Sequence, residues 1–476
     1  MNSSIVFPST FPVTCHTDFV GQNSCFVAIE GYAENGTKYI KQAIEKGART
    51  IVVHHTVLLD DELCAFIETH NVTLQRVDNS RKALAELSAQ AAGFPAQKLK
   101  IIGITGTKGK TTTSFLLEHI LHSAGYNTAL ISSAQNRICG NNFPAPLTTP
   151  QPDYLQQFLK LCVDNNVEYV VMEVAAQALT LHRVEGITFC GVIFTNFSHE
   201  HLEFYPTLDD YFKAKSLIFL SVSDDAPLLI NGDSEHGKIL LAQHEKAQSY
   251  GLEREQNYHG NFLSDPTHMV ELHVKHEDGG NDFSCPILFG AYNGYNVLAA
   301  ISMAQELNVG VKIIQYALQN FAGVPGRLQE HLLPNGARCF IDYAHNPESF
   351  KAVLSTLRVL TEQLIVVFGA GGGRDKSKRP MMGNIASQIA DIVVITSDNP
   401  RLEDPVMIAQ DITCGIPEES HHKIVQELDR KRAIELAYHL SDNGSIIVLL
   451  GKGPDEYQII GTTKHYFSER QIVEQL

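Results

Sequence analysis

The sequence predicts an α/β protein of three domains, and three observations support this prediction. The chain has 476 residues, which is the length of about three ordinary domains. Short apolar runs rich in β-branched residues, such as 101–105 and 169–174, alternate with segments of helical periodicity. This alternation is typical of parallel sheets covered by helices. A glycine-bearing turn also joins one of these strands directly to a helix.

The bulk composition narrows the possible partners. Hydrophobic residues make up 44% of the chain and charged residues 19%, as in ordinary globular proteins. The formal net charge of −16 argues against a nucleic-acid or anionic-membrane partner, so a bound nucleotide would need local cations. The sequence has no membrane-length apolar stretch and no basic-then-apolar N-terminus, which predicts a cytoplasmic protein without a membrane span.

The turn between strand 101–105 and the next helix predicts a phosphate-binding loop. Gly106 and Gly109 allow successive backbone N–H groups to converge, and the helix N-terminus adds its positive dipole end. Lys110 would reach the outer phosphates of a nucleotide, and the Thr111 hydroxyl would hold Mg²⁺, as in a P-loop. The alternative is a glycine-rich turn that binds nothing.

The first domain is expected at residues 1–98. It is a small α/β unit without a catalytic cluster of its own. Its expected strands are 24–29 and 50–53, its expected helices are 39–46 and 81–92, and its linker is 93–98.

The second domain is expected at residues 99–325, as a central parallel sheet. Its further expected strands are 127–132, 169–174 and 191–196, its expected helices include 208–220 and one that opens at 290–296, and 224–289 is expected to be irregular. Glu173 lies at the carboxyl end of an apolar strand, where open α/β sheets bind ligands. It is therefore a candidate Mg²⁺ ligand, and the alternative is that it caps the next helix.

Two other features of the second domain are open to more than one interpretation. His199 and His201 form a His-x-His sequence that is either a metal pair or a polar loop. Lys213 and Lys215 lie in the expected 208–220 helix among apolar residues, and they could be ordinary surface lysines.

The third domain is expected at residues 326–476, as a doubly wound, Rossmann-like unit. Its four expected strands are 338–343, 363–368, 391–397 and 445–450. The segment 369–374 is glycine-rich and suggests a dinucleotide loop, but Arg374 replaces the last glycine. The cations Lys376, Lys378 and Arg379 favour an anion-binding loop instead.

Several motifs occur in an order that resembles the Mur ligase family, over nearly the whole chain. They are residues 105–111, Glu173, residues 195–201 and 211–215, Gly326-Arg327, residues 342–347 and residues 398–401. The resemblance implies three domains that bind, in turn, a UDP-sugar substrate, ATP and an amino acid. It implies that ATP phosphorylates a carboxylate, that an amine then attacks the acyl phosphate, and that positioning and charge neutralisation dominate catalysis.

The resemblance also assigns residues to the ATP and metal sites. The ATP contacts it implies are Gly106, Thr107, Lys108, Gly109, Lys110, Thr111, Thr112, Asn293, Arg327 and Asp342. Thr111 and Glu173 would hold one Mg²⁺, and His201 and Lys215 a second. Lys215 would be carbamylated, which turns a cation into an anion that can approach Mg²⁺. Lys110, Lys215 and His201 would be the catalytic residues.

For the other two substrates, the resemblance implies UDP-N-acetylmuramoyl-L-alanyl-D-glutamate and meso-diaminopimelate, joined in peptidoglycan biosynthesis. Thr148, Thr149 and Arg183 would contact the first, and Arg374, Asp398, Asn399, Arg401, Gly451 and Asp455 the second. Arg401 favours diaminopimelate over lysine, because a guanidinium can hold the distal carboxylate that lysine lacks.

Some positions depart from the family pattern. The family's Asp-Ser-Arg is His16-Thr17-Asp18 here, its Ser-Ser-His is Ala175-Ala176-Gln177, a glutamine is Leu181, and a His-Glu is Pro454-Asp455. These changes leave a paralogous ligase with another carboxylate or amine as one alternative. A non-catalytic nucleotide-binding regulator is the other, although the intact phosphate and metal residues argue against it.

Overall fold

The computed structural model describes residues 5–31, 34–198, 204–276 and 279–476. The chain forms two compact units. The first comprises Met1–Leu263, Leu272–Ser284 and Tyr292–Phe321, and the second comprises Ser264–Glu271, Cys285–Ala291 and Ala322–Leu476. Within the described residues, no helix is both long and apolar enough to cross a membrane.

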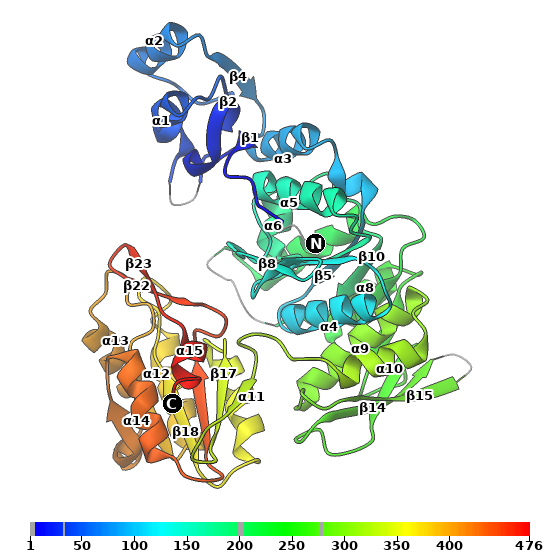
Figure 1. Cartoon of the computed structure of the whole chain (residues 1–476), viewed down its shortest axis with the longest axis vertical. Helices are drawn as coiled ribbons and strands as arrows, with labels where there is room; N and C mark the ends of the chain where they lie inside the picture. Colours follow the sequence, from blue (N-terminus) through cyan, green and yellow to red (C-terminus); the bar gives the residue numbers. More distant parts are fainter. Residues whose placement is uncertain (1–4, 32–33, 199–203, 277–278) are drawn as a thin grey trace. The chain divides into compact units, whose positions relative to one another are not determined.

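The first unit begins with a four-stranded parallel sheet in the order β1-β2-β3-β4 (Figure 1). Its elements are β1 (Phe11–Thr14), β2 (Val20–Val27), α1 (Ile40–Glu45), β3 (Thr50–His54), α2 (Asp61–Thr69), β4 (Thr73–Val77) and α3 (Ser80–Ala91). Alternate residues of β3 face opposite sides. Ile51 and Val53 pack with α1 and α2, while Val52 packs with α3. Strands β1 and β4 were not expected, and β4 exposes much of its length and so lacks an apolar run.

The same unit contains an eleven-stranded sheet in the order β15-β14-β13-β12-β11-β10-β5-β9-β6-β7-β8. Its strands are β5 (Lys100–Thr105), β6 (Thr128–Ile131), β7 (Asn136–Ile138), β8 (Asn141–Phe143), β9 (Tyr169–Glu173), β10 (Gly191–Phe194), β11 (Leu228–Asn231), β12 (Gln248–Gly251), β13 (Tyr258–Phe262), β14 (Val270–His276) and β15 (Gly279–Cys285). Its helices are α4 (Lys110–Ser123), α5 (Pro152–Asp164), α6 (Ala176–Thr180), α7 (Leu208–Ser216), α8 (Glu235–Gln243), α9 (Ala291–Glu306) and α10 (Val311–Gln319). Strands β6, β9, β5, β10 and β11 are parallel, so their carboxyl ends share one edge.

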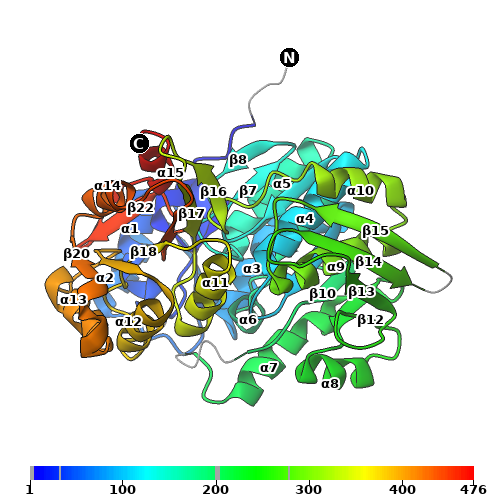
Figure 2. The same ribbon diagram turned by 90° about the horizontal axis from the view of Figure 1, so that it is seen from below.

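The expectation that residues 224–289 are irregular is wrong. This segment contains α8 and the five strands β11 to β15, which extend the sheet to its edge (Figure 2). The physical reason is that β14 pairs antiparallel with β13 and buries only alternate residues. A half-buried strand mixes polar and apolar residues, so it carries no continuous apolar signal.

The second unit contains a six-stranded sheet in the order β16-β17-β21-β18-β19-β20, and a separate β22–β23 hairpin. Its elements are β16 (Gln329–Leu332), β17 (Arg338–Asp342), α11 (Pro347–Arg358), β18 (Leu364–Phe368), α12 (Lys378–Ile389), β19 (Ile392–Ile395), α13 (Pro405–Thr413), β20 (Ile424–Gln426), α14 (Arg430–Leu440), β21 (Ile446–Leu450), β22 (Tyr457–Ile460), β23 (Thr463–Tyr466) and α15 (Glu469–Val473). Val366 of β18 packs in a core with α11, α12 and α13, whereas Val367 packs with α14 and α15. Helices therefore cover both faces, which confirms the doubly wound prediction.

Candidate active site

The turn between β5 and α4 adopts a backbone that only glycine tolerates well. We call residues 106–110 the phosphate loop. Gly106 has a φ of 143° and Gly109 a φ of 83°. A Cβ on Gly106 would lie 1.9 Å from the Thr195 hydroxyl oxygen, and one on Gly109 would lie 2.3 Å from the Asn296 side-chain oxygen. The two glycines therefore allow the loop to curl tightly against its neighbours.

The end of the adjacent strand β10 holds this loop in place. The Thr195 hydroxyl donates to the Lys108 carbonyl at 2.6 Å, and the Lys108 N–H donates to the Asn196 side-chain oxygen at 2.8 Å. The Thr107 N–H donates to the Asn196 carbonyl at 2.9 Å. The loop geometry is thus set by short hydrogen bonds before any ligand binds. Sequence reasoning singled out neither Thr195 nor Asn196 for this role.

Two lysines direct their ammonium groups at the same loop carbonyl. Lys110 donates to the Gly106 carbonyl at 2.8 Å and to that of Thr107 at 3.0 Å. Lys215 donates to the Gly106 carbonyl at 2.7 Å and lies 4.5 Å from the centre of the Tyr211 ring. Only 1% of Lys215 is exposed, so it is not the surface lysine that the sequence allowed, whereas Lys213 is exposed. Lys110 thus places a cation at the glycine turn, which favours an anionic ligand there.

Ser133 links Thr111 to Glu173 by hydrogen bonds, and the sequence did not identify this serine. The Thr111 hydroxyl lies 3.0 Å from that of Ser133, and Glu173 accepts from the Ser133 N–H at 2.8 Å. The helix-capping alternative for Glu173 is wrong, because Ala175 is the N-cap of α6 and makes no side-chain cap. The sequence signal for Ser133 was its position alone, two residues after the end of strand β6.

This oxygen donor set fits Mg²⁺, which prefers hydroxyl, carboxylate and water ligands. Glu173 is 1% exposed, and its position at the end of β9 places it beside the phosphate loop at the shared edge of the sheet. The described residues contain no group of three His, Cys, Asp or Glu side chains arranged to hold a metal. His199 and His201 lie outside the described residues.

Thr149 and Arg183 are joined behind Glu173. The Thr149 hydroxyl donates to the Glu173 carbonyl at 2.8 Å, and Arg183 donates to the Thr149 carbonyl at 3.0 Å. Among the described residues, the buried Nε of Arg183 has no hydrogen-bond partner. A buried guanidinium with an unused donor is prepared for an acceptor such as a carboxylate or phosphate. Thr148 is half-buried next to this pair.

Asn293 lies on α9 and connects to the helix that follows the phosphate loop. Its side-chain oxygen accepts from Asn296 at 3.0 Å, and Asn296 in turn accepts from Thr113 of α4 at 3.4 Å. Both asparagines and Thr112 of α4 are buried. Asn293 is therefore held in a fixed position relative to α4.

In the second unit, Asp342 ends β17 as a buried carboxylate. It accepts from the Leu328 N–H at 2.8 Å and from the Ala344 N–H at 2.7 Å. Burial nevertheless raises the pKa of Asp342, although the nearby Arg327 opposes this shift. The Arg327 guanidinium lies 4.8 Å from the centre of the Tyr343 ring. Asp342 thus fixes the backbone that carries Arg327.

A second loop of candidate residues follows β19, and we call residues 397–401 the amine loop. Asn399 accepts from the Ile459 N–H of β22 at 2.8 Å. Arg401 has a φ of 53°, unusual for a non-glycine residue, and its Nη1 donates to the Gly372 carbonyl at 2.8 Å. The Arg401 backbone also bonds to Ile459 and Gly461 of the hairpin. Contacts distant in sequence therefore determine this loop.

The glycine-rich segment 369–374 packs against the amine loop. A Cβ on Gly369 would lie 2.2 Å from the Thr396 carbonyl oxygen, and one on Gly372 would lie 1.9 Å from that of Pro400. These glycines therefore serve close packing of two loops. Arg374 is exposed.

The cations after this segment are held by the protein's own groups, contrary to the anion-binding interpretation. Buried Arg379 donates to Glu403 at 2.9 Å and to Asp411 at 2.8 Å, and Lys376 lies 3.3 Å from Glu403. Hydrogen bonds from Arg379 and the Gly373 N–H lower the pKa of Glu403 to about 2. Lys378 donates to the His345 carbonyl at 2.9 Å.

The turn after β21 completes this region. Gly451 has a φ of 110°, and a Cβ there would lie 2.6 Å from a carboxylate oxygen of Asp398. Burial raises the pKa of Asp455, and the nearby Lys452 opposes the shift. Gly451 and Asp455 therefore lie in the same neighbourhood as Asp398, as the sequence predicted without showing why.

The parallel sheet, the glycine turn and its two lysines define a nucleotide-binding α/β protein. Three family models match the chain: Mur ligase family, catalytic domain (residues 13–92), Mur ligase middle domain (104–304) and Mur ligase, glutamate ligase domain (326–453). The chain belongs to the Mur ligase family. It is therefore an ATP-dependent ligase that forms amide bonds.

The relatives agree over nearly the full length. The chain is 38% identical to UDP-N-acetylmuramoyl-L-alanyl-D-glutamate–2,6-diaminopimelate ligase of Clostridium botulinum, over 96% of this chain and 93% of that one. A solved structure with the same protein name is 27% identical, with a TM-score of 0.65, and covers 98% of this chain and 94% of that one. MurF ligase of Thermotoga maritima in complex with ADP is 17% identical with a TM-score of 0.61, covers 93% of this chain and 94% of that one, and so shows the fold alone.

Proposed function

We propose that this chain adds meso-diaminopimelate to UDP-N-acetylmuramoyl-L-alanyl-D-glutamate at the expense of ATP, in peptidoglycan biosynthesis. The observation that carries the proposal is the amine loop, in which Asp398, Asn399 and Arg401 are held together at the end of β19. Two relatives that are named for this reaction match the chain over 96% and 95% of its length. The proposed domains are 1–98 for the UDP-substrate, 99–325 for ATP and 326–476 for the amino acid.

The reaction proceeds in two steps. An oxygen of the glutamate carboxylate attacks the γ-phosphorus of ATP, the bond to the ADP oxygen breaks, and an acyl phosphate forms. The amine nitrogen then attacks the carbonyl carbon, and phosphate leaves as the amine loses a proton. No side-chain nucleophile is required, so catalysis depends on holding the reactants and neutralising their charge.

The phosphate loop supplies the ATP site. The backbone N–H groups where the loop enters α4 and the positive end of that helix would bind the phosphates, and Lys110 would leave the Gly106 and Thr107 carbonyls to contact the γ-phosphate. Bound Mg²⁺ would neutralise phosphate charge, with Thr111 and Glu173 as ligands of one ion and His201 and carbamylated Lys215 as ligands of another. Further ATP contacts are proposed for Gly106, Thr107, Lys108, Gly109, Thr112, Asn293, Arg327 and Asp342.

The amine site depends on complementary charge. Arg401 would bind the distal carboxylate of diaminopimelate, while Asp455 would accept hydrogen bonds from a substrate ammonium. With lysine bound, Arg401 would face an ammonium of its own sign, so the site rejects lysine by repulsion as well as by lost attraction. Arg374, Asp398, Asn399 and Gly451 are the other proposed contacts.

The departures in the first unit favour a second candidate, a ligase that takes another carboxylate substrate. Ala175 lies beside Thr149, whose hydroxyl accepts from the Ala175 N–H at 3.0 Å, and its methyl group offers no hydrogen bond where the family has a serine. Arg183, Thr148 and Thr149 remain to hold the substrate. The choice between the two candidates concerns the carboxylate substrate and leaves the ATP chemistry unchanged.

Amine-dependent phosphate release separates these candidates. We expect release when UDP-N-acetylmuramoyl-L-alanyl-D-glutamate, meso-diaminopimelate and ATP are all present, and little when lysine replaces diaminopimelate. Arg401→Ala should raise the KM for diaminopimelate about tenfold or more, since a charged hydrogen bond is lost, with the KM for ATP little changed. Lys431→Ala removes an exposed cation from the same unit and is the control. A wild-type preference for lysine would refute the amine assignment.

A further inference from the structure

Lys452 is a buried cation beneath the amine loop, and the proposed reaction has not yet given it a role. None of its surface is exposed. Its ammonium lies 3.5 Å from the Asn399 side-chain oxygen and 3.9 Å from a carboxylate oxygen of Asp398. It also lies 5.7 Å from the centre of the Tyr457 ring and 5.8 Å from that of Phe467. Burying a lysine is costly unless its charge is paired, so this placement requires an explanation.

Lys452 lies among charged side chains of the amine site. Asp398, Asp455, Glu469 and Arg430 interact with it electrostatically, while Lys464 and Lys378 also act on Asp455 and Asp398. Arg430 donates to Glu469 at 2.8 Å, and both side chains are almost completely buried. Arg430 is thus engaged with Glu469, and Lys452 is the cation nearest Asp398. The Lys452 ammonium therefore contacts two of the residues that are proposed to bind the amino acid.

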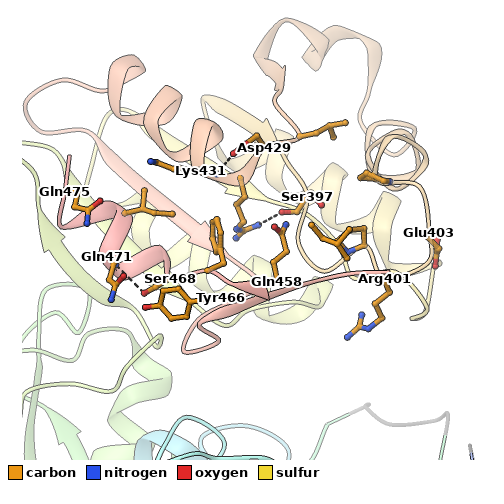
Figure 3. Close-up of a pocket in the computed structure, with 17 residues that line it drawn as sticks. Ser397, Arg401, Glu403, Asp429, Lys431, Gln458, Tyr466, Ser468, Gln471 and Gln475 are labelled. Carbon is orange, nitrogen blue, oxygen red and sulfur yellow. Dashed lines mark hydrogen bonds between the residues drawn. The ribbon is translucent and has the colours of Figure 1, made fainter. Parts of the chain in front are cut away.

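The amine loop has little packing on one flank. A cavity of about 590 Å³ is lined by Ser397, Pro400 and Arg401 of the loop, by Arg430 of α14 and by Gln458 of the hairpin (Figure 3). Because side chains do not fill this space, polar contacts must fix the loop. Gln458 donates to the Asp398 carbonyl at 2.7 Å, Ile459 donates to Asn399, and Lys452 contacts both side chains from inside.

We propose that Lys452 is a positioning residue of the amine site, which orients the side chains of Asp398 and Asn399 for the incoming amino acid. This inference rests on the proposed function, because it takes these two side chains to be contacts of that amino acid. Without Lys452, the Asp398 carboxylate would lose a buried cation at 3.9 Å, and Asn399 would lose a buried hydrogen-bond donor. The amine loop would then bind diaminopimelate poorly, while the ATP site would be unaffected.

Steady-state kinetics with separate titration of each substrate tests the role. Lys452→Met keeps an unbranched side chain that is one atom shorter and removes its charge, so the KM for diaminopimelate should rise about tenfold or more. The KM for ATP should stay within about twofold. Lys351→Met is the control, because Lys351 is an exposed lysine on α11 of the same unit. Lys452→Gln, which retains a donor to Asn399, should give an intermediate KM for the amine.

The coupling to Asn399 provides a second readout. If Lys452 acts through Asn399, Asn399→Ala and Lys452→Met should be non-additive in their effect on the KM for diaminopimelate. An unchanged amine KM with a lowered kcat, or equal rises in all three KM values, would overturn the positioning role. If Lys452→Met does not fold, the Lys452→Gln variant decides by the same criteria. Failure of the proposed function is recognised separately, because the wild-type protein would then show no diaminopimelate-dependent phosphate release.

Discussion

The phosphate loop and the amine loop both follow parallel strands, but they are held in different ways. The phosphate loop is fixed by glycine conformations and by hydrogen bonds to Thr195 and Asn196 on the adjacent strand. The amine loop is fixed by side chains and by a hairpin about 60 residues further along the chain. Both loops therefore depend on contacts distant in the sequence, 88 residues apart for the phosphate loop and 60 for the amine loop. They differ because the phosphate loop also requires the backbone conformations of its two glycines.

This difference predicts how each loop responds to mutation. Changes within the phosphate loop should abolish ATP chemistry outright, since no other residue can replace its glycine conformations or the cation of Lys110. Changes near the amine loop should be graded and should affect one substrate. The following predictions test this contrast, beginning with the largest expected effect.

Lys110→Ala should reduce amine-dependent phosphate release by about 10²-fold or more, because it removes a cation placed on the migrating phosphoryl group. Folding should be little affected, as measured by thermal unfolding. Lys100→Ala, at the exposed start of β5, is the control and should behave as the wild type. A folded Lys110→Ala protein with near-normal phosphate release would refute the role of the phosphate loop.

Lys215→Ala should also be inactive, yet added formate or acetate should restore part of its activity, because the missing group would be an anionic metal ligand. The exposed Lys213 provides the matched control, and Lys213→Ala should be nearly silent. Mass spectrometry of the active wild-type protein should show a carbamate on Lys215 under mild conditions. An unmodified Lys215 in active protein would rule out the carbamate.

Gly106→Ala should lower both stability and ATP affinity, whereas Gly125→Ala should lower stability alone. Both glycines have positive φ values, but a Cβ on Gly125 would meet nothing within 4 Å. The left-handed backbone alone costs alanine about 1 kcal/mol, and Gly106→Ala adds the contact with Thr195. Chemical denaturation and nucleotide titration separate the two effects. Equal destabilisation by both variants would show that crowding by Thr195 is unimportant.

Asp455→Asn should give a small gain in stability at neutral pH together with weaker diaminopimelate binding. Burial raises the pKa of Asp455 in the folded protein above its value in the unfolded chain. The folded state therefore retains this proton more strongly, and stability is lost as the pH rises from the ordinary carboxyl range through the folded-state pKa. Thermal unfolding should show the variant above the wild type at pH 7 and equal to it near pH 3. A variant less stable than the wild type at pH 7 would contradict this sign.

Much of the site could be predicted because its signals are local. Residues 101–111 contain strand, glycines, lysine and threonine in one uninterrupted stretch, and the structure gives them the expected form. Ser133 could not be found in this way, because an isolated serine after a strand has no distinctive pattern. The burial of Lys452 was likewise hidden, since a lysine in a glycine-rich turn is usually exposed.

The sequence by itself determined the class of fold and the glycine turn between β5 and α4. It could do so because apolar periodicity and glycine backbone preferences act over a few residues. Only the tertiary structure decided that residues 224–289 extend the central sheet, that Lys215 is buried against Gly106 and that Arg379 is paired with Glu403 and Asp411. These outcomes depend on partners dozens of residues or more away along the chain. Burial and charge pairing of that kind arise only from packing, which no local pattern encodes.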